Sequence, residues 1–135
     1  MALFTWNDSY SVKVELCDAQ HKKLFVIINN LADAMRMGRG QDVVTATVGE
    51  LPQYTRTHFQ QEEALLRTAN YPQLASHQEQ HRRFIADVEA LERDSSAGQA
   101  ANSIKVLNLL RDWLLNHIQK TDKQYSAHLN AAGIR

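Results

Sequence analysis

Apolar residues recur every three or four positions along four stretches of this 135-residue chain, which is the spacing of an α-helix with one buried face. The stretches cover about 18–37, 41–69, 72–93 and 101–128, and short breaks rich in glycine, proline, asparagine or serine separate them. Helices of similar length joined by short loops pack antiparallel to their neighbours. The pattern therefore predicts an all-α fold, an antiparallel up-down-up-down four-helix bundle.

The first 17 residues do not show this helical spacing. Tyr10, Val12 and Val14 alternate with polar residues as in a strand, but no other segment offers a pairing partner. We therefore predict an extended, irregular N-terminal arm anchored by Trp6, with Asp18 as the N-cap of the first helix. The chain is then a single domain of the usual size, with the arm at 1–17, the bundle at 18–128 and a tail at 129–135.

Gly49 and Pro52 interrupt the second helical stretch. A proline inside a helix removes one backbone hydrogen bond and clashes with the preceding turn. We therefore expect either a kink near residues 48–52 or a break into two helices. Residues 54–69 remain helical in both cases.

Several histidines and acids occupy helix positions that the pattern otherwise gives to leucine, isoleucine, valine or phenylalanine. Side chains four residues apart in an α-helix differ in direction by only about 40°, so two close pairs each project from one face. Burying such groups without a partner would cost roughly 1–3 kcal/mol each, and a shared metal removes this cost. A buried polar network without metal is the alternative. The candidate ligands use five of the six histidines and are His21, His58, Glu62, His77, His81, His117 and Asp122.

Three polar residues, one of them a candidate ligand, differ from the others in direction or in position along the helix. Asp122 follows His117 by five residues, so an α-helix would rotate it by about 140°, and only a local π-bulge or a displaced centre would bring it to the same metals. Glu63 is rotated equally far from His58, and we expect it to be exposed. His128 lies about 16 Å further along the helix axis than His117, which excludes it from the site.

The donor set favours two metal ions over one. Five imidazoles and two carboxylates exceed the needs of a four-coordinate structural zinc, and no thiolate is suitably placed. Two six-coordinate ions offer about twelve positions; two bridging carboxylates and five histidines fill about nine, which leaves room for a bridging oxo or hydroxo group and one open position. Imidazole with carboxylate suits iron in the Fe²⁺ and Fe³⁺ states, although manganese or a mixed pair fits the same donors.

Charge and composition narrow the possible partners. Lysine plus arginine balance aspartate plus glutamate at 15 each, so no net charge attracts nucleic acid or an anionic membrane. No segment approaches the roughly 20 apolar residues of a membrane span, and residues 1–10 do not resemble a signal peptide. The single cysteine, Cys17, cannot form an intrachain disulfide. We expect a cytoplasmic protein with neither a nucleic-acid nor a membrane partner.

Five motifs occur in a fixed order along essentially the whole chain. They are Trp6-Asn7; Asp18-Ala19-Gln20-His21-Lys22-Lys23-Leu24-Phe25; His58-Phe59-Gln60-Gln61-Glu62-Glu63; His77-Gln78-Glu79-Gln80-His81; and Trp113-Leu114-Leu115-Asn116-His117-Ile118 with Thr121-Asp122-Lys123. In this combination the sequence resembles the haemerythrin family, and its bacterial members in particular.

This resemblance implies a role for each candidate ligand. One iron would be held by His77, His81 and His117, and the other by His21 and His58. Glu62 and Asp122 would bridge them. The family binds dioxygen end-on at the iron with two histidines, in a dry apolar pocket, and the residues that match this pocket are Leu24, Phe59, Trp113, Leu114 and Ile118.

The expected function is reversible dioxygen binding for storage, delivery or sensing. No Glu-x-x-His motif occurs in the sequence, which separates this nitrogen-rich site from ferritins and carboxylate-rich di-iron oxygenases. One alternative is a di-iron enzyme that reduces dioxygen, peroxide or nitric oxide with the same ligands. Another is a redox signalling module that acts on a partner in trans, because no output domain follows. Iron storage is least favoured, and the sequence identifies no protein that would receive the oxygen.

Three residues depart from the family pattern. Gly49 and Pro52 touch no expected ligand, but a kink at this position could change access to the site. Cys17 precedes the first ligand by one helical turn. We expect it to be an inert buried residue rather than a redox-active thiol.

Overall fold

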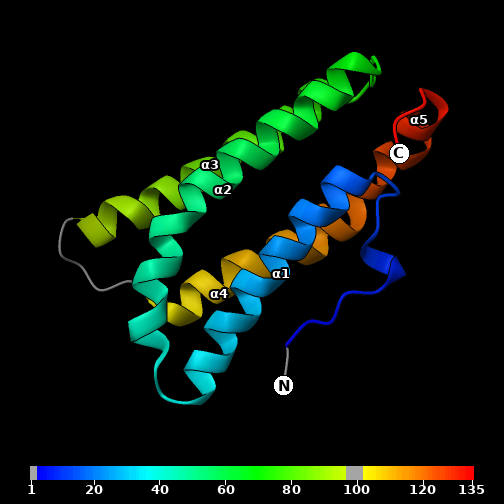
Figure 1. The fold of residues 1–135 in the computed structure, drawn as a ribbon. Helices are drawn as coiled ribbons and strands as arrows, with labels where there is room; N and C mark the ends of the chain where they lie inside the picture. Colours follow the sequence, from blue (N-terminus) through cyan, green and yellow to red (C-terminus); the bar gives the residue numbers. More distant parts are fainter. Residues whose placement is uncertain (1–2, 97–101) are drawn as a thin grey trace.

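The computed structural model describes residues 3–96 and 102–135, which form a helical bundle (Figure 1). Helix α1 packs against α2 and α4, and α2 also packs against α3 and α4. The described residues contain no strand, so the predicted all-α four-helix bundle is confirmed. The main elements are α1 (Glu15–Arg36), α2 (Gly40–Thr68), α3 (Leu74–Ser96) and a composite fourth helix, made of α4 (Ser103–Asp112), η2 (Trp113–Thr121), η3 (Asp122–Tyr125) and α5 (Ser126–Ala131).

Three predicted helix ends were wrong. Helix α1 begins three residues before Asp18, after the extended residue Val14. Asp18 instead accepts hydrogen bonds from the Val12 amide (2.8 Å) and the Ser11 hydroxyl (2.6 Å), so its carboxylate holds the arm and does not cap the helix. Helix α3 continues to Ser96, three residues beyond its predicted end, and the rest of the expected break before residue 101 lies outside the described residues. The fourth helix ends with α5 at Ala131, inside the predicted tail at 129–135.

The N-terminal arm is irregular, with one short 3₁₀ turn, η1 (Asp8–Tyr10). Trp6 packs against Phe25 with ring centroids 5.2 Å apart, and Tyr10 packs against the same ring at 4.7 Å. The backbone of Phe4 exchanges two hydrogen bonds with the side chain of Asn29. Trp6 therefore anchors the arm to α1, as the sequence predicted.

Helix α2 is continuous through Pro52. The sequence allowed either a kink or a break into two helices at this segment, and the break does not occur. Figure 1 shows that α2 changes direction where its cyan part meets its green part, which is the expected kink. The hydroxyl of Thr55 donates to the carbonyl oxygens of Leu51 (2.9 Å) and Pro52 (3.1 Å) in this region. Gly49 faces solvent with no side chain near it.

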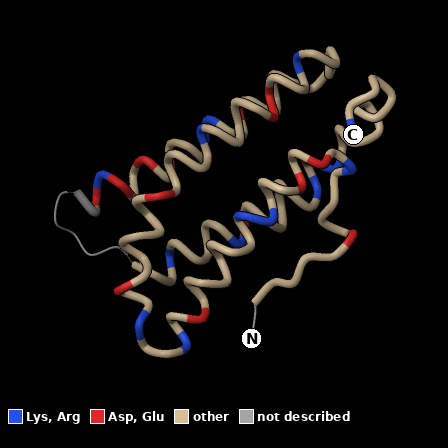
Figure 2. Tube along the Cα trace, viewed as in Figure 1, with Lys and Arg blue, Asp and Glu red and all other residues tan. Residues whose placement is uncertain are grey.

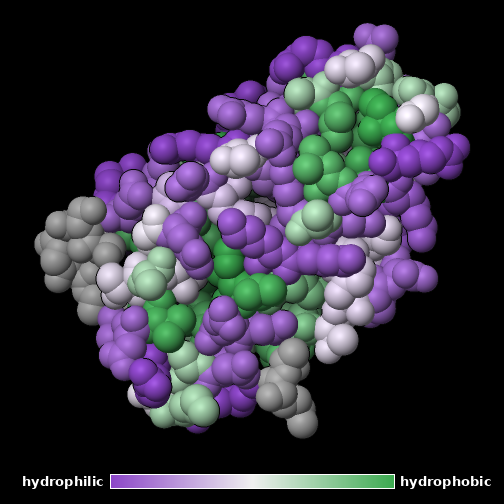
Figure 3. Space-filling model, viewed as in Figure 1, coloured by the Kyte–Doolittle hydropathy of each residue, from purple (hydrophilic) through white to green (hydrophobic). Residues whose placement is uncertain are grey.

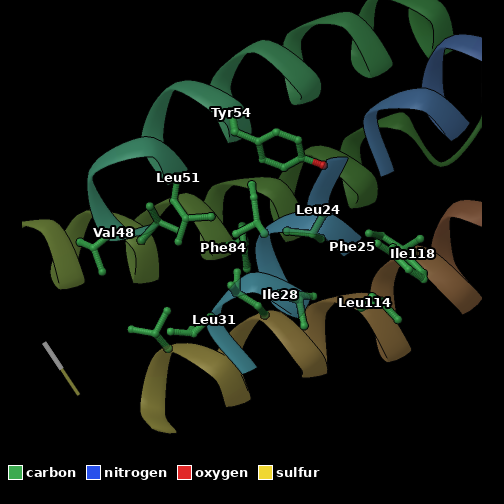
Figure 4. Packing of buried hydrophobic residues seen from close by; sticks show 14 of the residues in the cluster. Leu24, Phe25, Ile28, Leu31, Val48, Leu51, Tyr54, Phe84, Leu114 and Ile118 are labelled. Atoms are coloured by element: carbon green, nitrogen blue, oxygen red, sulfur yellow. The ribbon is translucent and has the colours of Figure 1, made fainter. Parts of the chain in front are cut away.

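The apolar core is divided into two clusters. The larger one joins the inner faces of all four helices (Figure 4), where Leu24, Ile28, Leu51, Phe84 and Leu114 are among its members. The smaller cluster lies toward the chain termini and contains Val12, Val14, Cys17, Leu66, Tyr71, Tyr125 and Leu129. Along each helix the candidate ligands fall between these two clusters. Each fully buried large apolar side chain contributes about 1.5–3 kcal/mol, so the polar layer is held between two strongly packed regions.

The described helices carry charged residues of both signs. Acidic and basic residues are interspersed along the helices (Figure 2). On the face shown in Figure 3, hydrophilic side chains surround several smaller apolar areas. Among the described residues, no helix has the length and apolar character required to cross a membrane.

Candidate metal centre

The structure brings all seven predicted ligands together. Each helix contributes at least one of them, and none is more than 3% exposed. Their donor atoms form two groups that share Glu62, and within each group these atoms lie within 4.8 Å of one another. The larger group is Glu62, His77, His81, His117 and Asp122, and the smaller is His21, His58 and Glu62.

Glu62 faces both histidine groups with different oxygens. Its Oε1 atom lies 2.8 Å from Nε2 of His77 and 3.1 Å from Nε2 of His81. Its Oε2 atom lies 3.4 Å from Nε2 of His58 and 3.6 Å from Nε2 of His21. One carboxylate therefore spans the two groups, as a ligand that bridges two metals must.

Asp122 divides its oxygens in the same way. Its Oδ1 atom lies 2.9 Å from Nε2 of His77 and 3.0 Å from Nε2 of His117, whereas Oδ2 lies 3.2 Å from Nε2 of His21. The two acids thus contact the same pair of histidine groups from different helices.

A π-helical segment explains how Asp122 reaches the site. The backbone N–H of Asp122 donates to the carbonyl oxygen of His117, an i→i+5 bond in place of the α-helical i→i+4 bond. This pattern extends over η2 (Trp113–Thr121) and brings residues five apart onto one face. Of the two arrangements that the sequence allowed for Asp122, the structure therefore contains the π-helical one.

Unsatisfied buried atoms test whether metal ions fit here. Among the described residues, neither oxygen of Asp122 has a hydrogen-bond partner, nor does Nε2 of His81 or of His117. These atoms lie near one another without the alignment of a hydrogen bond. Leaving each such group unpaired costs about 1–3 kcal/mol, which coordination would remove. The donor set therefore fits two metal ions better than a metal-free polar network.

The charges of the buried acids and histidines shift one another's pKa values. Burial raises the pKa of Glu62, but the adjacent charge of His58 and hydrogen bonds from other histidines outweigh it, so the pKa lies well below its ordinary value. Burial lowers the pKa of both His21 and His77, but the close carboxylates of Asp122 and Glu62 dominate and raise these values to about 9 and about 10. Without metal these two histidines carry protons at neutral pH, and a metal ion must displace them.

Three side chains that the sequence analysis missed orient the histidines. Nδ1 of His58 donates to Gln20 (2.5 Å), Nδ1 of His81 to Glu63 (2.6 Å), and Nδ1 of His117 to Gln80 (2.8 Å). Each bond directs Nε2 of its histidine toward the centre and fixes the tautomer. The expectation that Glu63 is exposed was wrong, because its side chain is only 21% exposed and bonds to His81.

The sequence does contain a signal for these partners. Gln20 precedes His21, Glu63 follows Glu62, and Gln80 precedes His81. Each partner therefore adjoins a ligand in sequence but serves a histidine of the neighbouring helix. This relation depends on how the helices are rotated against one another, which helical spacing alone does not give.

A buried tyrosine supports the Glu62 carboxylate from the other side. The hydroxyl of Tyr125 donates to Oε2 of Glu62 at 2.9 Å, and the tyrosine is completely buried. The thiol of Cys17 is hydrogen-bonded to Tyr125, and burial raises the pKa of this thiol. The position of Cys17 as a buried residue agrees with expectation.

The expected pocket residues form an apolar layer beside the ligands. Figure 4 shows Leu24, Leu114 and Ile118 among the side chains that fill the space between α1 and the fourth helix. Phe59 stacks on His81 with ring centroids 3.8 Å apart, and half-buried Trp113 stacks on His117 at the same distance. These two rings therefore lie against the larger histidine group.

The bend in α2 borders a polar cleft of about 390 Å³ between α1 and α2. The cleft extends from the exposed residues Lys23 and Glu50 to His58 and its partner Gln20. A second cleft, of about 220 Å³, lies between α2 and α3 and reaches Glu63 and His81. Solvent thus approaches the outer edge of both histidine groups without entering the layer of ligands.

A four-helix bundle that buries two shared carboxylates between groups of three and two histidines has the donor set of the imidazole–carboxylate class of metal-binding proteins. Comparison with known proteins gives a narrower assignment. Residues 12–129 match the family described as "Hemerythrin HHE cation binding domain", and the chain belongs to the haemerythrin family.

Similar proteins cover nearly the whole chain. The bacteriohaemerythrin of Methylococcus capsulatus is 32% identical over 132 residues, which is 97% of this chain and 100% of that protein. The bacteriohaemerythrin of Pseudomonas aeruginosa is 33% identical over 125 residues, covering 93% of this chain and 80% of that one. A crystal structure of wild-type haemerythrin is 31% identical and superposes with a TM-score of 0.84 over 95% of this chain and 98% of its own.

Proposed function

We propose that this protein binds dioxygen reversibly at a non-haem di-iron centre, for oxygen storage, delivery or sensing. The observation that carries the proposal is the way Glu62 and Asp122 each divide their oxygens between a group of three histidines and a group of two. Two such groups would supply unequal numbers of protein donors to a pair of metal ions, and an added ligand could bind beside the group of two histidines.

The chain supplies a complete set of ligands for such a centre. His77, His81 and His117 would hold one iron, and His21 and His58 the other, with both carboxylates as bridges. A bridging oxo or hydroxo group would complete the shared coordination. When bound, the ferrous pair supplies the electrons that allow dioxygen to bind and leave reversibly.

Apolar side chains keep water away from this centre. Leu24, Leu114 and Ile118 are almost completely buried and, with Phe59 and Trp113, cover the ligands on one side. A dry site disfavours the escape of charged, partly reduced oxygen species such as superoxide or peroxide, and so slows oxidation of the metal pair to an inactive state. This environment supports a binding role over continuous turnover.

The test uses the full chain loaded with iron under anaerobic reducing conditions. Metal analysis should find two iron ions per chain, aeration should produce a ligand-to-metal absorption band, and vacuum should remove it. The His77→Ala variant, which lacks one ligand of the larger group, is the control and should not show this reversible band. If the reduced wild-type protein shows no absorption change on aeration, dioxygen binding is wrong.

The principal alternative is an enzyme that reduces dioxygen, peroxide or nitric oxide at the same ligands. The polar cleft that reaches His58 favours this alternative, because it brings solvent to the edge of the smaller histidine group. Continuous consumption of substrate with an electron donor would identify an enzyme. A carrier should instead bind one equivalent of dioxygen and oxidise slowly.

A further inference from the structure

The outer hydrogen bonds of the histidines differ in charge. His58, in the smaller group, donates to the neutral amide of Gln20. In the larger group, His117 donates to the neutral amide of Gln80, whereas His81 donates to the carboxylate of Glu63. Among these three bonds, a negative charge is therefore present only beside the group of three histidines.

The surroundings of Glu63 keep its carboxylate ionised. The N–H at Nδ1 of His81 donates to Oε2 of Glu63 at 2.6 Å, the length of a charge-assisted hydrogen bond. The amide of Gln78 donates to the other oxygen, Oε1, at 3.1 Å. Glu63 also borders the cleft of about 220 Å³ between α2 and α3, so its charge retains contact with solvent. Both carboxylate oxygens are thus occupied, and the side chain has a fixed orientation.

We propose that Glu63 is a positioning residue that makes the metal of the three-histidine group the more electron-rich of the pair. This inference rests on the proposed di-iron centre. A carboxylate that accepts the Nδ1 proton of a ligating histidine raises the basicity of Nε2 and fixes the ring toward the metal. The higher oxidation state of that metal is then favoured. The metal of the smaller group, with Gln20 as the outer partner of His58, keeps the higher reduction potential.

The chain offers a matched set of variants, because glutamine and glutamate have nearly the same shape. Glu63→Gln keeps an oxygen that accepts from His81 but removes the charge. Gln80→Glu adds a charge to the same metal through His117, and Gln20→Glu adds one to the other metal through His58. The three variants separate charge from position, since all retain a hydrogen-bond acceptor.

The experiment measures reduction potentials of the iron-loaded full chain by spectroelectrochemistry and assigns the two irons by Mössbauer spectroscopy of the half-oxidised form. Glu63→Gln should raise the reduction potential of the three-histidine iron, and Gln80→Glu should lower it. Gln20→Glu should lower the reduction potential of the other iron and so reduce the difference between the two potentials. Chelator competition should show a loss of metal affinity of about 10–100-fold in Glu63→Gln. In the metal-free protein, ¹⁵N NMR should find His81 protonated at Nδ1 in the wild type.

Three outcomes are decisive. Opposite shifts in Glu63→Gln and Gln80→Glu, with unchanged circular dichroism, would support the role of Glu63. Unchanged potentials and affinities in both variants would overturn it, while the proposed dioxygen binding would stand if the wild-type protein still held two iron ions and bound dioxygen. A wild-type protein that holds no pair of metal ions would overturn both proposals.

Discussion

The hydroxyl of Tyr125 offers a direct measure of how strongly the protein supports the Glu62 carboxylate. Replacing Tyr125 by phenylalanine removes the hydroxyl that donates to Oε2 of Glu62 at 2.9 Å. The ring remains, so its packing against Tyr71, with centroids 6.3 Å apart, is kept and no large cavity forms. A hydrogen bond to a charged group contributes about 1.5–3 kcal/mol. We expect the free energy of unfolding of the metal-free protein to fall by this amount.

Urea unfolding followed by circular dichroism measures this loss, and the melting temperature should fall by about 3–5 °C for each kcal/mol. The control is Tyr71→Phe, because Tyr71 belongs to the same core cluster and is 8% exposed, but no hydrogen bond from the described residues acts on its hydroxyl. That variant should change the unfolding free energy by less than about 0.5 kcal/mol. If Tyr125→Phe costs no more than Tyr71→Phe, the bond to Glu62 contributes nothing and our account of the carboxylate is wrong.

Three further predictions concern the ligands. His77→Ala should abolish the two-metal stoichiometry, because His77 contacts both carboxylates; metal analysis that found a full complement would contradict the ligand assignment. Deleting exposed Lys120 should convert the π turn to an α turn and place Asp122 four residues after His117, about 40° away in direction. Metal analysis of this variant should still find two ions, whereas a variant with one alanine inserted at the same place should lose them. Loss of metal in both variants would exclude the π-helical placement of Asp122. In the metal-free protein, the pKa values of His21 and His77 are raised from 6.5 to about 9 and about 10. Their protonation therefore stabilises the fold fully below pH 6.5, and this contribution disappears as the pH rises through 9 and 10. Urea unfolding at pH 6, 8 and 10 should show that the free energy of unfolding declines, and an unchanged free energy would contradict the prediction.

The architecture and most of the ligands could be predicted from the sequence because both follow from spacing within one helix. His58 with Glu62, and His77 with His81, share a face in any α-helix. Their place on otherwise apolar faces indicated burial, and the structure places them in the polar layer between the two core clusters. Asp122 needed the family resemblance, since a π-helical segment is not encoded in a visible repeat.

The features that could not be predicted depend on contacts between segments. Asp18 has the type of side chain that caps helices, but the arm folds back so that Ser11 and Val12 use its carboxylate. Glu63 lies outside the predicted inner face of α2, yet α3 presents His81 to it. In both cases the neighbouring segment determines the role of the residue, and a pattern read along one helix does not contain that information.

The environment of Cys17 has a consequence for the proposed binding of dioxygen. Tyr125 contacts both its sulfur and the Glu62 carboxylate, so Cys17 lies close to the proposed dioxygen-binding centre. Oxidants attack the anionic form of a thiol, and complete burial with a raised pKa keeps this sulfur protonated at neutral pH. The bundle thereby carries an oxidisable atom close to its reactive centre in a form that resists oxidation.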